Sequence, residues 1–418
     1  MFKINKQVLY QFLFISFLLY GPVIVLSGIR IDFRISVILI TFFIFYIYLL
    51  KKGTLLIKPK KLIVSIYIIL GLIFIYMLFI VIHLNDTYML NLSIRLIIFF
   101  TLTLLILKYF QENKIFFKYF FDFLFYATAL NSLSILLMAY FEPLRDFIQS
   151  YQLQILLLQV SGDIRMMALN GLAGSTLSLY TFFGFVAYFY TYSKPNLVKN
   201  ISLLIILISF LYSGRTGLIF VILYVFIKVF MWLNKKINII SSVIVYIIFL
   251  LIFLLLGDLF VSNLDFFPKE VINTFRFLSS MYTTETGLPI TMEELLLNNL
   301  FLPSENILFG SIGYYEHNNG ELHSDIGYIK MLFSIGIVGQ FLFSILYLFI
   351  FVCAYNYRKY EKTFNYSILL VIFIFLFHLK GLSLGGTLST FILFLSFFVS
   401  YYRMRYINIH TLVPNNQI

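Results

Sequence analysis

The sequence predicts an all-α polytopic integral membrane protein with about twelve transmembrane helices. The 418 residues are 61% hydrophobic and only 11% charged. The apolar side chains gather in repeated runs of about 17 to 25 residues, a length that spans the ~30 Å hydrocarbon core of a bilayer. Because these runs are continuously apolar instead of alternating, each would satisfy its backbone hydrogen bonds internally as a helix, and a β-barrel is disfavoured.

The first apolar run starts at Val8 and continues to about Leu26 without a small-residue cleavage site, so we expect a retained helix and no removable signal peptide. The predicted helices lie near residues 8–28, 35–50, 62–82, 89–107, 119–141, 171–192, 200–212, 217–233, 238–256, 326–354, 364–379 and 384–401. Between the ninth and tenth helices, residues 257–325 are expected to form a large external, periplasmic loop within a single transmembrane domain that covers residues 1–418. Residues 151–160 have apolar spacings that predict a helix lying along the membrane surface.

The formal charge of +12 follows the loops in an alternating pattern. If both termini are cytoplasmic, the basic residues concentrate in the inner loops, which is the positive-inside pattern. The inner-loop cations are Lys51, Lys52, Lys58, Lys60, Lys61, Lys108, Lys114, Lys118, Lys194, Lys199, Lys235, Lys236, Arg358, Lys359, Lys362, Arg403 and Arg405. Membrane topology and anionic lipid therefore account for the charge, and no nucleic-acid partner is expected.

Several signatures of soluble enzymes are missing. The sequence contains no G-x-x-x-x-G-K-[ST], no G-x-S-x-G, no H-E-x-x-H and no C-x-x-C, so ATP hydrolysis, serine hydrolysis and zinc-protease chemistry lack their usual marks. The one cysteine, Cys353, lies within an apolar run and can form no internal disulfide. We expect no cofactor.

A short polar turn, Ser213-Gly214-Arg215-Thr216-Gly217, separates two apolar runs on the predicted outer face. Its small residues allow a tight reversal, and a guanidinium there presents a planar fork of donors that suits a phosphate or diphosphate. The alternative is that Arg215 only extends its charge to the membrane interface.

The second polar feature precedes the tenth predicted helix. Two histidines and three carboxylates fall within ten residues, and they are Glu316, His317, Glu321, His323 and Asp325. His323 would stand at the water interface, where an imidazole can remove a proton from an attacking hydroxyl near neutral pH, while Ser324 or Asp325 caps the helix. The alternatives are ordinary surface histidines, or a metal cluster, for which the spacing matches no standard motif. We therefore predict no metal.

Other cations are predicted on the outer face. Arg165 lies just before a helix, Arg276 lies in the large loop, and Arg95 lies more than a turn inside its apolar run, where a charge is costly unless it faces a cavity or reaches the interface. Each alone is compatible with a surface position. Together with Arg215 they predict an outward-facing cavity that attracts polyanionic lipid headgroups.

The pattern Ser213-Gly214-Arg215-Thr216-Gly217 opening a helix, followed later by His323-Ser324-x-x-Gly327-Tyr328-x-x-x-Leu332-x-x-x-Gly336-x-x-Gly339, resembles the O-antigen polymerase and O-antigen ligase superfamily. The helix count, the inner termini and the single late outer loop agree with that resemblance. It implies that Arg215 and His323 act at a lipid diphosphate and an accepting sugar. His323 is followed by serine where many relatives have asparagine, whereas His317-Asn318 has that dipeptide, so both histidines remain candidates.

The resemblance implies a metal-independent membrane glycosyltransferase in the bacterial inner (plasma) membrane. It would join polyprenyl-diphosphate-linked oligosaccharide repeat units into O-antigen, capsular polysaccharide or exopolysaccharide, alongside a flippase and a chain-length regulator. His323 or Glu321 would be the general base, and Arg215, with Arg165 or Arg276, would hold the diphosphate. Further substrate-binding residues are expected to be Arg95, His317 and Asp325. The alternatives are an O-antigen ligase and a flippase or transporter of lipid-linked sugar.

Overall fold

The computed structural model of the 418-residue chain describes only part of it, and every structural statement below refers to that part. The described residues are 6–26, 29–32, 37–41, 43–44, 47, 61–111, 114–150, 174–213, 215–233, 302–303, 306–313, 326–379, 384 and 387–407. The predicted helix at 238–256 and the predicted surface helix at 151–160 lie outside them.

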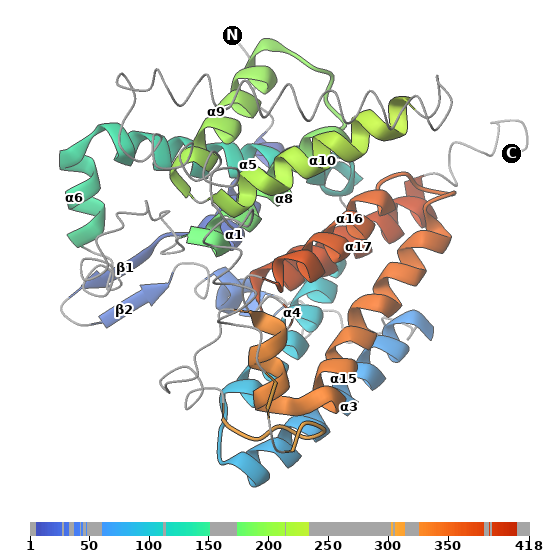
Figure 1. Ribbon diagram of the computed structural model, residues 1–418. Helices are drawn as coiled ribbons and strands as arrows, with labels where there is room; N and C mark the ends of the chain where they lie inside the picture. Colours follow the sequence, from blue (N-terminus) through green and yellow to red (C-terminus); the bar gives the residue numbers. More distant parts are fainter. Residues whose placement is uncertain are drawn as a thin grey trace, which may run out of the picture.

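Helices dominate the described chain (Figure 1). Their bounds are α1 Lys6–Tyr20, α3 Lys61–Leu84, α4 Tyr88–Tyr109, α5 Lys114–Tyr140, α6 Glu142–Ser150, α8 Gly174–Ala187, α9 Leu197–Ser213, α10 Arg215–Leu233, α15 Gly327–Tyr357, α16 Phe364–Phe377 and α17 Leu388–Tyr402. A 3₁₀ turn at Tyr188–Tyr190 extends α8, and a π-helical turn at Arg403–Ile407 extends α17. Four of the helices, α3, α4, α5 and α15, are long and apolar enough to cross a bilayer. The chain is a helical membrane protein, as the sequence predicts.

The first helix is shorter than predicted. It ends at Tyr20, not near residue 28, because Gly21-Pro22 follows and a proline has no N–H to continue the helical hydrogen bonds. The β-branched residues beyond it form a two-stranded antiparallel hairpin of β1 Val23–Leu26 and β2 Ile29–Asp32, in which Val25 is opposite Arg30.

Several helices begin earlier than the apolar runs predict, and α5 and α10 are two of them. Lys114 opens α5, where the run predicts a start near residue 119, and Arg215 opens α10, where the run predicts a start at residue 217. Lysine and arginine are good helix formers, so a helix extends past the end of its apolar run. The predicted outer segment after residue 141 also contains a helix, α6, which the apolar pattern misses because only part of its surface is apolar.

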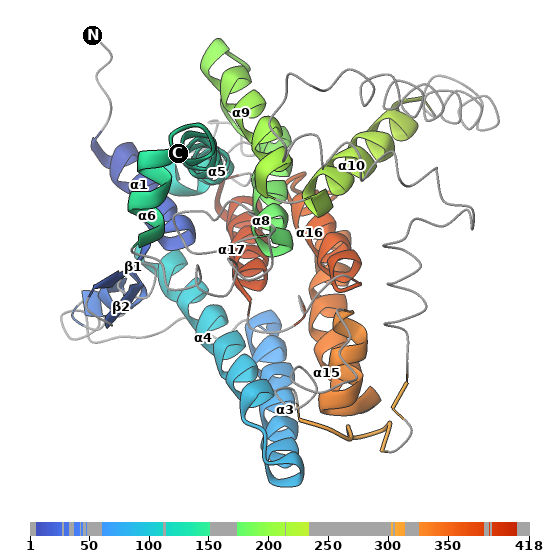
Figure 2. The same ribbon diagram turned by 60° about the vertical axis from the view of Figure 1, so that its left-hand side comes forward.

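Helix α3 packs against α4 and α15, and α15 packs against α16 (Figures 1 and 2). This group of four helices has two ends, which the next contacts define. At one end of the group, α3 turns into α4. The start of α15 lies short of that turn, beside the end of α16, where Gly327 bonds His378 (Figure 1), and we call this side of the group the Gly327 end. At the opposite end, which we call the Lys61 end, α3 begins, α4 turns into α5 and α17 finishes, with the Tyr402 hydroxyl donating to the carbonyl of Gln111 at 2.7 Å.

Aromatic side chains fill the interior between α8, α10 and α16. The Phe182 and Phe373 rings lie 4.4 Å apart between their centroids, and the buried Tyr366 hydroxyl donates to the carbonyl of Phe183 at 3.0 Å. These contacts hold α8 against α16. They give α10 a fixed aromatic surface on which its first turns pack.

Candidate functional site

The start of α15 is fixed by a tertiary contact and not by a capping side chain. Its N-cap residue is Ile326, in an extended conformation and without a side-chain cap. The N–H of Gly327 donates instead to the backbone carbonyl of His378 at 2.9 Å. The predicted cap by Ser324 or Asp325 is therefore wrong, because the end of α16 supplies the acceptor that a capping side chain would otherwise provide.

His378 is the histidine that the described structure places at this helix start. Its side chain is completely buried, its ring meets the Tyr328 ring edge-on at 4.4 Å, and its Nδ1 accepts a long hydrogen bond of 3.5 Å from the N–H of Leu384. Tyr328 is itself anchored, because its hydroxyl donates to the carbonyl of Phe375 at 3.0 Å. In the sequence, His378 lies at the end of the predicted helix 364–379 and carries no predicted role. The one feature of the sequence that could have drawn attention to His378 is its position at the end of an apolar run.

Helix α15 is interrupted at Gly336, whose φ of 64° and ψ of −174° are not helical. Residues 306–313, which we call the clip, replace the helical hydrogen bonds lost there. The carbonyl of Phe333 accepts from Ser311 N–H at 2.8 Å, and the N–H of Ile337 donates to the carbonyl of Ile307 at 3.0 Å. The Tyr76 hydroxyl of α3 donates to the carbonyl of Ile335 at 2.8 Å. Such an irregular backbone in a membrane protein is tolerated only where protein or a cavity surrounds it.

The far end of the clip reaches the turn between α3 and α4. A Cβ at Gly313 would lie 2.8 Å from Oδ2 of Asp86, so a larger residue there would force the Asp86 side chain to shift. The described chain thus holds Gly313 against Asp86 on one side and Ile326 beside His378 on the other. The predicted acidic and histidine-rich residues fall between these two held positions in the sequence.

The turn that carries Arg215 is connected to the start of α15 through the end of α16. Helix α10 packs so closely on its neighbours that a Cβ at Gly217 would lie 2.6 Å from the Phe210 ring and 2.8 Å from Cβ of Ser178. One turn further, Phe220 contacts the Phe377 ring at a centroid distance of 6.2 Å. Because the next residue, His378, bonds the start of α15, the starts of α10 and α15 are linked through the end of α16.

Next to this turn, buried polar side chains lie between α5 and α9. Ser209 of α9 donates to the hydroxyl of Ser132 on α5 at 3.0 Å. The buried Oγ of Ser213 and the buried amide of Asn131 have no hydrogen-bond partner among the described residues. Buried polar groups without partners are rare, and they are typical of places where water or a polar ligand group enters.

Most of the predicted site residues lie outside the described part of the chain. These are Arg165, Arg276, His317, Glu321, His323 and Asp325. Arg215 is described as the first residue of α10, and Arg95 is exposed about two turns inside α4. In the described chain, no group of three His, Cys, Asp or Glu side chains could hold a metal ion.

The chain matches no protein-family model, no curated protein and no solved structure.

Replacement of His378 tests how the start of α15 is held. We expect His378→Ala to lower the free energy of unfolding by about 2 to 3 kcal/mol, because it removes buried volume and the acceptor for Leu384. His378→Phe keeps the volume and loses the acceptor, whereas His378→Asn keeps an acceptor near Nδ1 and loses volume. Thermal unfolding in detergent measures all three variants against His83→Ala, an exposed histidine at the same end. Equal midpoints for His378→Ala and His83→Ala would contradict the assignment.

Proposed function

We propose that this protein is a polymerase that joins polyprenyl-diphosphate-linked oligosaccharide repeat units into O-antigen, capsular polysaccharide or exopolysaccharide. It would act at the outer leaflet of the bacterial inner membrane. The proposal includes twelve spans, a large external loop at residues 257–325 between the ninth and tenth, and cytoplasmic termini. The expected partners are the lipid-linked donor, membrane lipid, a flippase and a chain-length regulator.

One observation carries the proposal. In the sequence, one polar point opens α10 and the other directly precedes α15, and the end of α16 contacts both helices, through Phe377 to Phe220 and through His378 to Gly327. A glycosyl transfer from a diphosphate needs a cation at the leaving group and a base at the acceptor, brought to one place from different parts of the chain. The link through α16 supports that arrangement.

The chemistry requires little from the protein beyond positioning. The hydroxyl of one repeat unit would attack the anomeric carbon of the other, the bond to the diphosphate oxygen would break, and the diphosphate would leave with the electron pair. His323, or Glu321 beside it, would take the hydroxyl proton, and Arg215 would stabilise the charge on the leaving diphosphate. Arg165 or Arg276 would assist Arg215, while Arg95, His317 and Asp325 would contact diphosphate or glycan.

The distribution of charge supports the orientation. Among the described residues, the Lys61 end carries most of the cations of the α3, α4, α15 and α16 group and its connections, whereas Lys330 and Arg95 lie nearer the Gly327 end. The cations at or beyond the Lys61 end are Lys61, Lys108, Lys114, Arg358, Lys359, Lys362, Arg403 and Arg405. By the positive-inside rule, the Lys61 end would face the cytoplasm and the Gly327 end the outside.

Deletion of the gene, followed by gel analysis of the surface glycan, tests the proposed reaction. We expect single repeat units without a ladder, because chain growth stops while transfer to the final acceptor continues. Total loss of glycan on its acceptor would instead identify a ligase, and accumulation of lipid-linked repeat units in the cytoplasm would identify a flippase.

Complementation of the deletion strain tests the residues. We expect Arg215→Ala and His323→Ala to reduce ladder formation by at least about 100-fold at matched protein levels, as removal of an electrostatic or acid–base group does in other enzymes. Arg215→Lys should retain partial activity, since lysine keeps the charge but loses the planar fork. Arg358→Ala, at the Lys61 end, is the control. A full ladder from both alanine variants would refute the site.

A further inference from the structure

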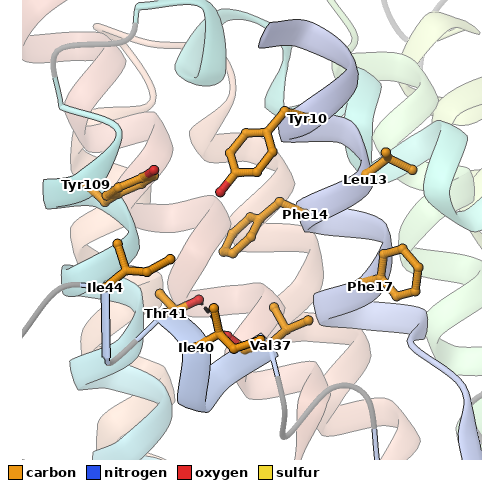
Figure 3. Close-up of a pocket in the computed structure, with 9 residues that line it drawn as sticks. All are labelled: Tyr10, Leu13, Phe14, Phe17, Val37, Ile40, Thr41, Ile44 and Tyr109. Carbon is orange, nitrogen blue, oxygen red and sulfur yellow. Dashed lines mark hydrogen bonds between the residues drawn. The ribbon is translucent and has the colours of Figure 1, made fainter. Parts of the chain in front are cut away.

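An apolar groove lies far from the proposed site. It runs along α1 between the helical residues 37–41 and the end of α4, and its volume is about 240 Å³ (Figure 3). Phe14 and Phe17 of α1 form one wall, and Ile40 and Thr41 form the facing wall. The hydroxyl of Thr41 is bonded to the carbonyl of Val37 in its own helix at 2.7 Å, so it does not make the groove polar.

One end of the groove is polar. The Tyr10 and Tyr109 side chains point toward each other there, so their hydroxyls lie at this end (Figure 3). Tyr109 is the last residue of α4, which places this polar end at the Lys61 end of the protein, and Phe17 and Val37 lie further along the groove. The groove therefore has an apolar length and a hydroxyl-bearing mouth.

Two lysines lie on the helix ends that form this mouth. Lys6 precedes Tyr10 by one turn and so lies on the same side of α1, and Lys108 precedes Tyr109. The ammonium of Lys108 is bonded to Oε1 of Gln111 at 2.9 Å, which keeps it beside the turn that leads to Lys114. Lysines on these helix ends favour a negatively charged lipid headgroup near the mouth.

We propose that this groove binds an anionic phospholipid, with one acyl chain along Phe14 and Phe17 and the phosphate at the Tyr10–Tyr109 mouth. The apolar groove matches the acyl chain of the lipid, and the lysines and tyrosine hydroxyls match its phosphate. The site is distinct from the proposed catalytic region, because the mouth is at the Lys61 end and the starts of α10 and α15 pack against the end of α16 near Gly327. Its occupant would belong to the leaflet at the Lys61 end.

Native mass spectrometry of the full chain, released from nanodiscs, tests this site. The probes are phosphatidylglycerol and phosphatidylcholine in equal amounts, with polyprenyl phosphate as a competitor. We expect one retained phosphatidylglycerol, preferred over phosphatidylcholine by at least about tenfold, because several lysines each favour the anion. Equal retention of the two phospholipids, or displacement of phosphatidylglycerol by stoichiometric polyprenyl phosphate, would overturn the proposal.

Two matched pairs of variants locate the lipid. Ile40→Trp fills the groove and should reduce retention at least fivefold, whereas Ile75→Trp, on an exposed part of α3, should not change it. Lys6→Gln should reduce the preference for phosphatidylglycerol at least twofold, whereas Lys359→Gln, an exposed lysine after α15, should not. Equal behaviour within either pair would place the lipid elsewhere. Because retention is measured without activity, this result is independent of the proposed polymerase reaction.

Discussion

Replacement of Gly336 by alanine is expected to be one of the most damaging single methyl additions in the described chain. The φ of 64° lies in the left-handed region, which costs an L residue roughly 1–2 kcal/mol. The new Cβ would also lie 2.2 Å from the carbonyl oxygen of Leu308 and 2.5 Å from the backbone nitrogen of Phe309. Those atoms belong to the main chain of the clip and cannot move aside like the end of a flexible side chain.

We therefore expect Gly336→Ala to lower the free energy of unfolding by more than about 2 kcal/mol, the range of severe backbone and overpacking effects. The measurement is the thermal midpoint of the detergent-solubilised protein, followed by size-exclusion chromatography of the fraction that remains monodisperse. Gly71→Ala is the matched control, because Gly71 lies within α3 and a Cβ there would meet nothing within 4 Å. If the two variants had the same midpoint, the clip would not be held as described.

The same substitution has a functional consequence. The clip leads directly toward residues 314–325, and Gly336 determines where the clip lies against α15. Displacement of the clip should therefore reduce ladder formation more than the loss of protein accounts for. A variant with normal activity per molecule would show that the clip supports stability alone.

Gly336 also shows what hydropathy can and cannot predict. The apolar run from residue 326 predicts a helix correctly, because burial in lipid requires the helix backbone to satisfy itself. The run does not predict the interruption, since the bonds that replace the helical ones come from Ser311 and Ile307, which lie in a distant segment. In the sequence, Gly336 and Gly339 stand out only as parts of a family pattern, which does not indicate their conformation.

The candidate site is also predictable from the sequence only in part. The turn at Arg215 and the start of α15 near residue 326 are predicted from local polarity and hydropathy. Their link through Phe377 and His378 depends on how three helices pack, which no local pattern contains. The prediction of Ser324 or Asp325 as the N-cap is wrong for the same reason. The N-cap residue is Ile326, and the backbone carbonyl of His378 accepts the hydrogen bond that a capping side chain would otherwise accept.

Removal of the Asp122 carboxylate is the second substitution with a large expected effect. Asp122 is 4% exposed on α5, and its Oδ2 accepts from the N–H of Tyr192 at 2.8 Å while its Oδ1 accepts from the N–H of Ser193 at 3.1 Å. The hydroxyl of Ser193 also donates to Oδ1. These bonds tie the turn between α8 and α9 to α5.

A buried cation depends on the same turn. Lys199 is 3% exposed, and its ammonium donates to the carbonyl of Ser193 at 2.9 Å and to the hydroxyl of Thr191. Burial disfavours the charged form of this lysine, and the negative charge of Asp122 offsets part of that cost. Without that carboxylate, the two N–H groups lose their acceptors and the lysine charge loses its compensation.

We expect Asp122→Ala to lower the free energy of unfolding by about 3–5 kcal/mol, the usual cost of removing one member of a buried charged network. Asp122→Asn should cost less, because its amide oxygen can still accept from one of the two N–H groups. Asp146→Ala is the control, since that carboxylate is 71% exposed and pairs with Arg145 at the surface, where the loss is within about 0.5 kcal/mol.

A double-mutant cycle separates the charge from the hydrogen bonds. Lys199→Met alone removes a buried cation and leaves Asp122 without it. If the two groups compensate each other, Asp122→Ala combined with Lys199→Met should be less damaging than the sum of the single effects by at least about 1 kcal/mol. Strict additivity would mean that Asp122 acts only as an acceptor for the turn, and that Lys199 is held by Thr191 and Ser193 alone. In either case the bonds to Asp122 hold the turn that precedes α9, and α9 ends at Ser213, directly before the predicted diphosphate-binding turn.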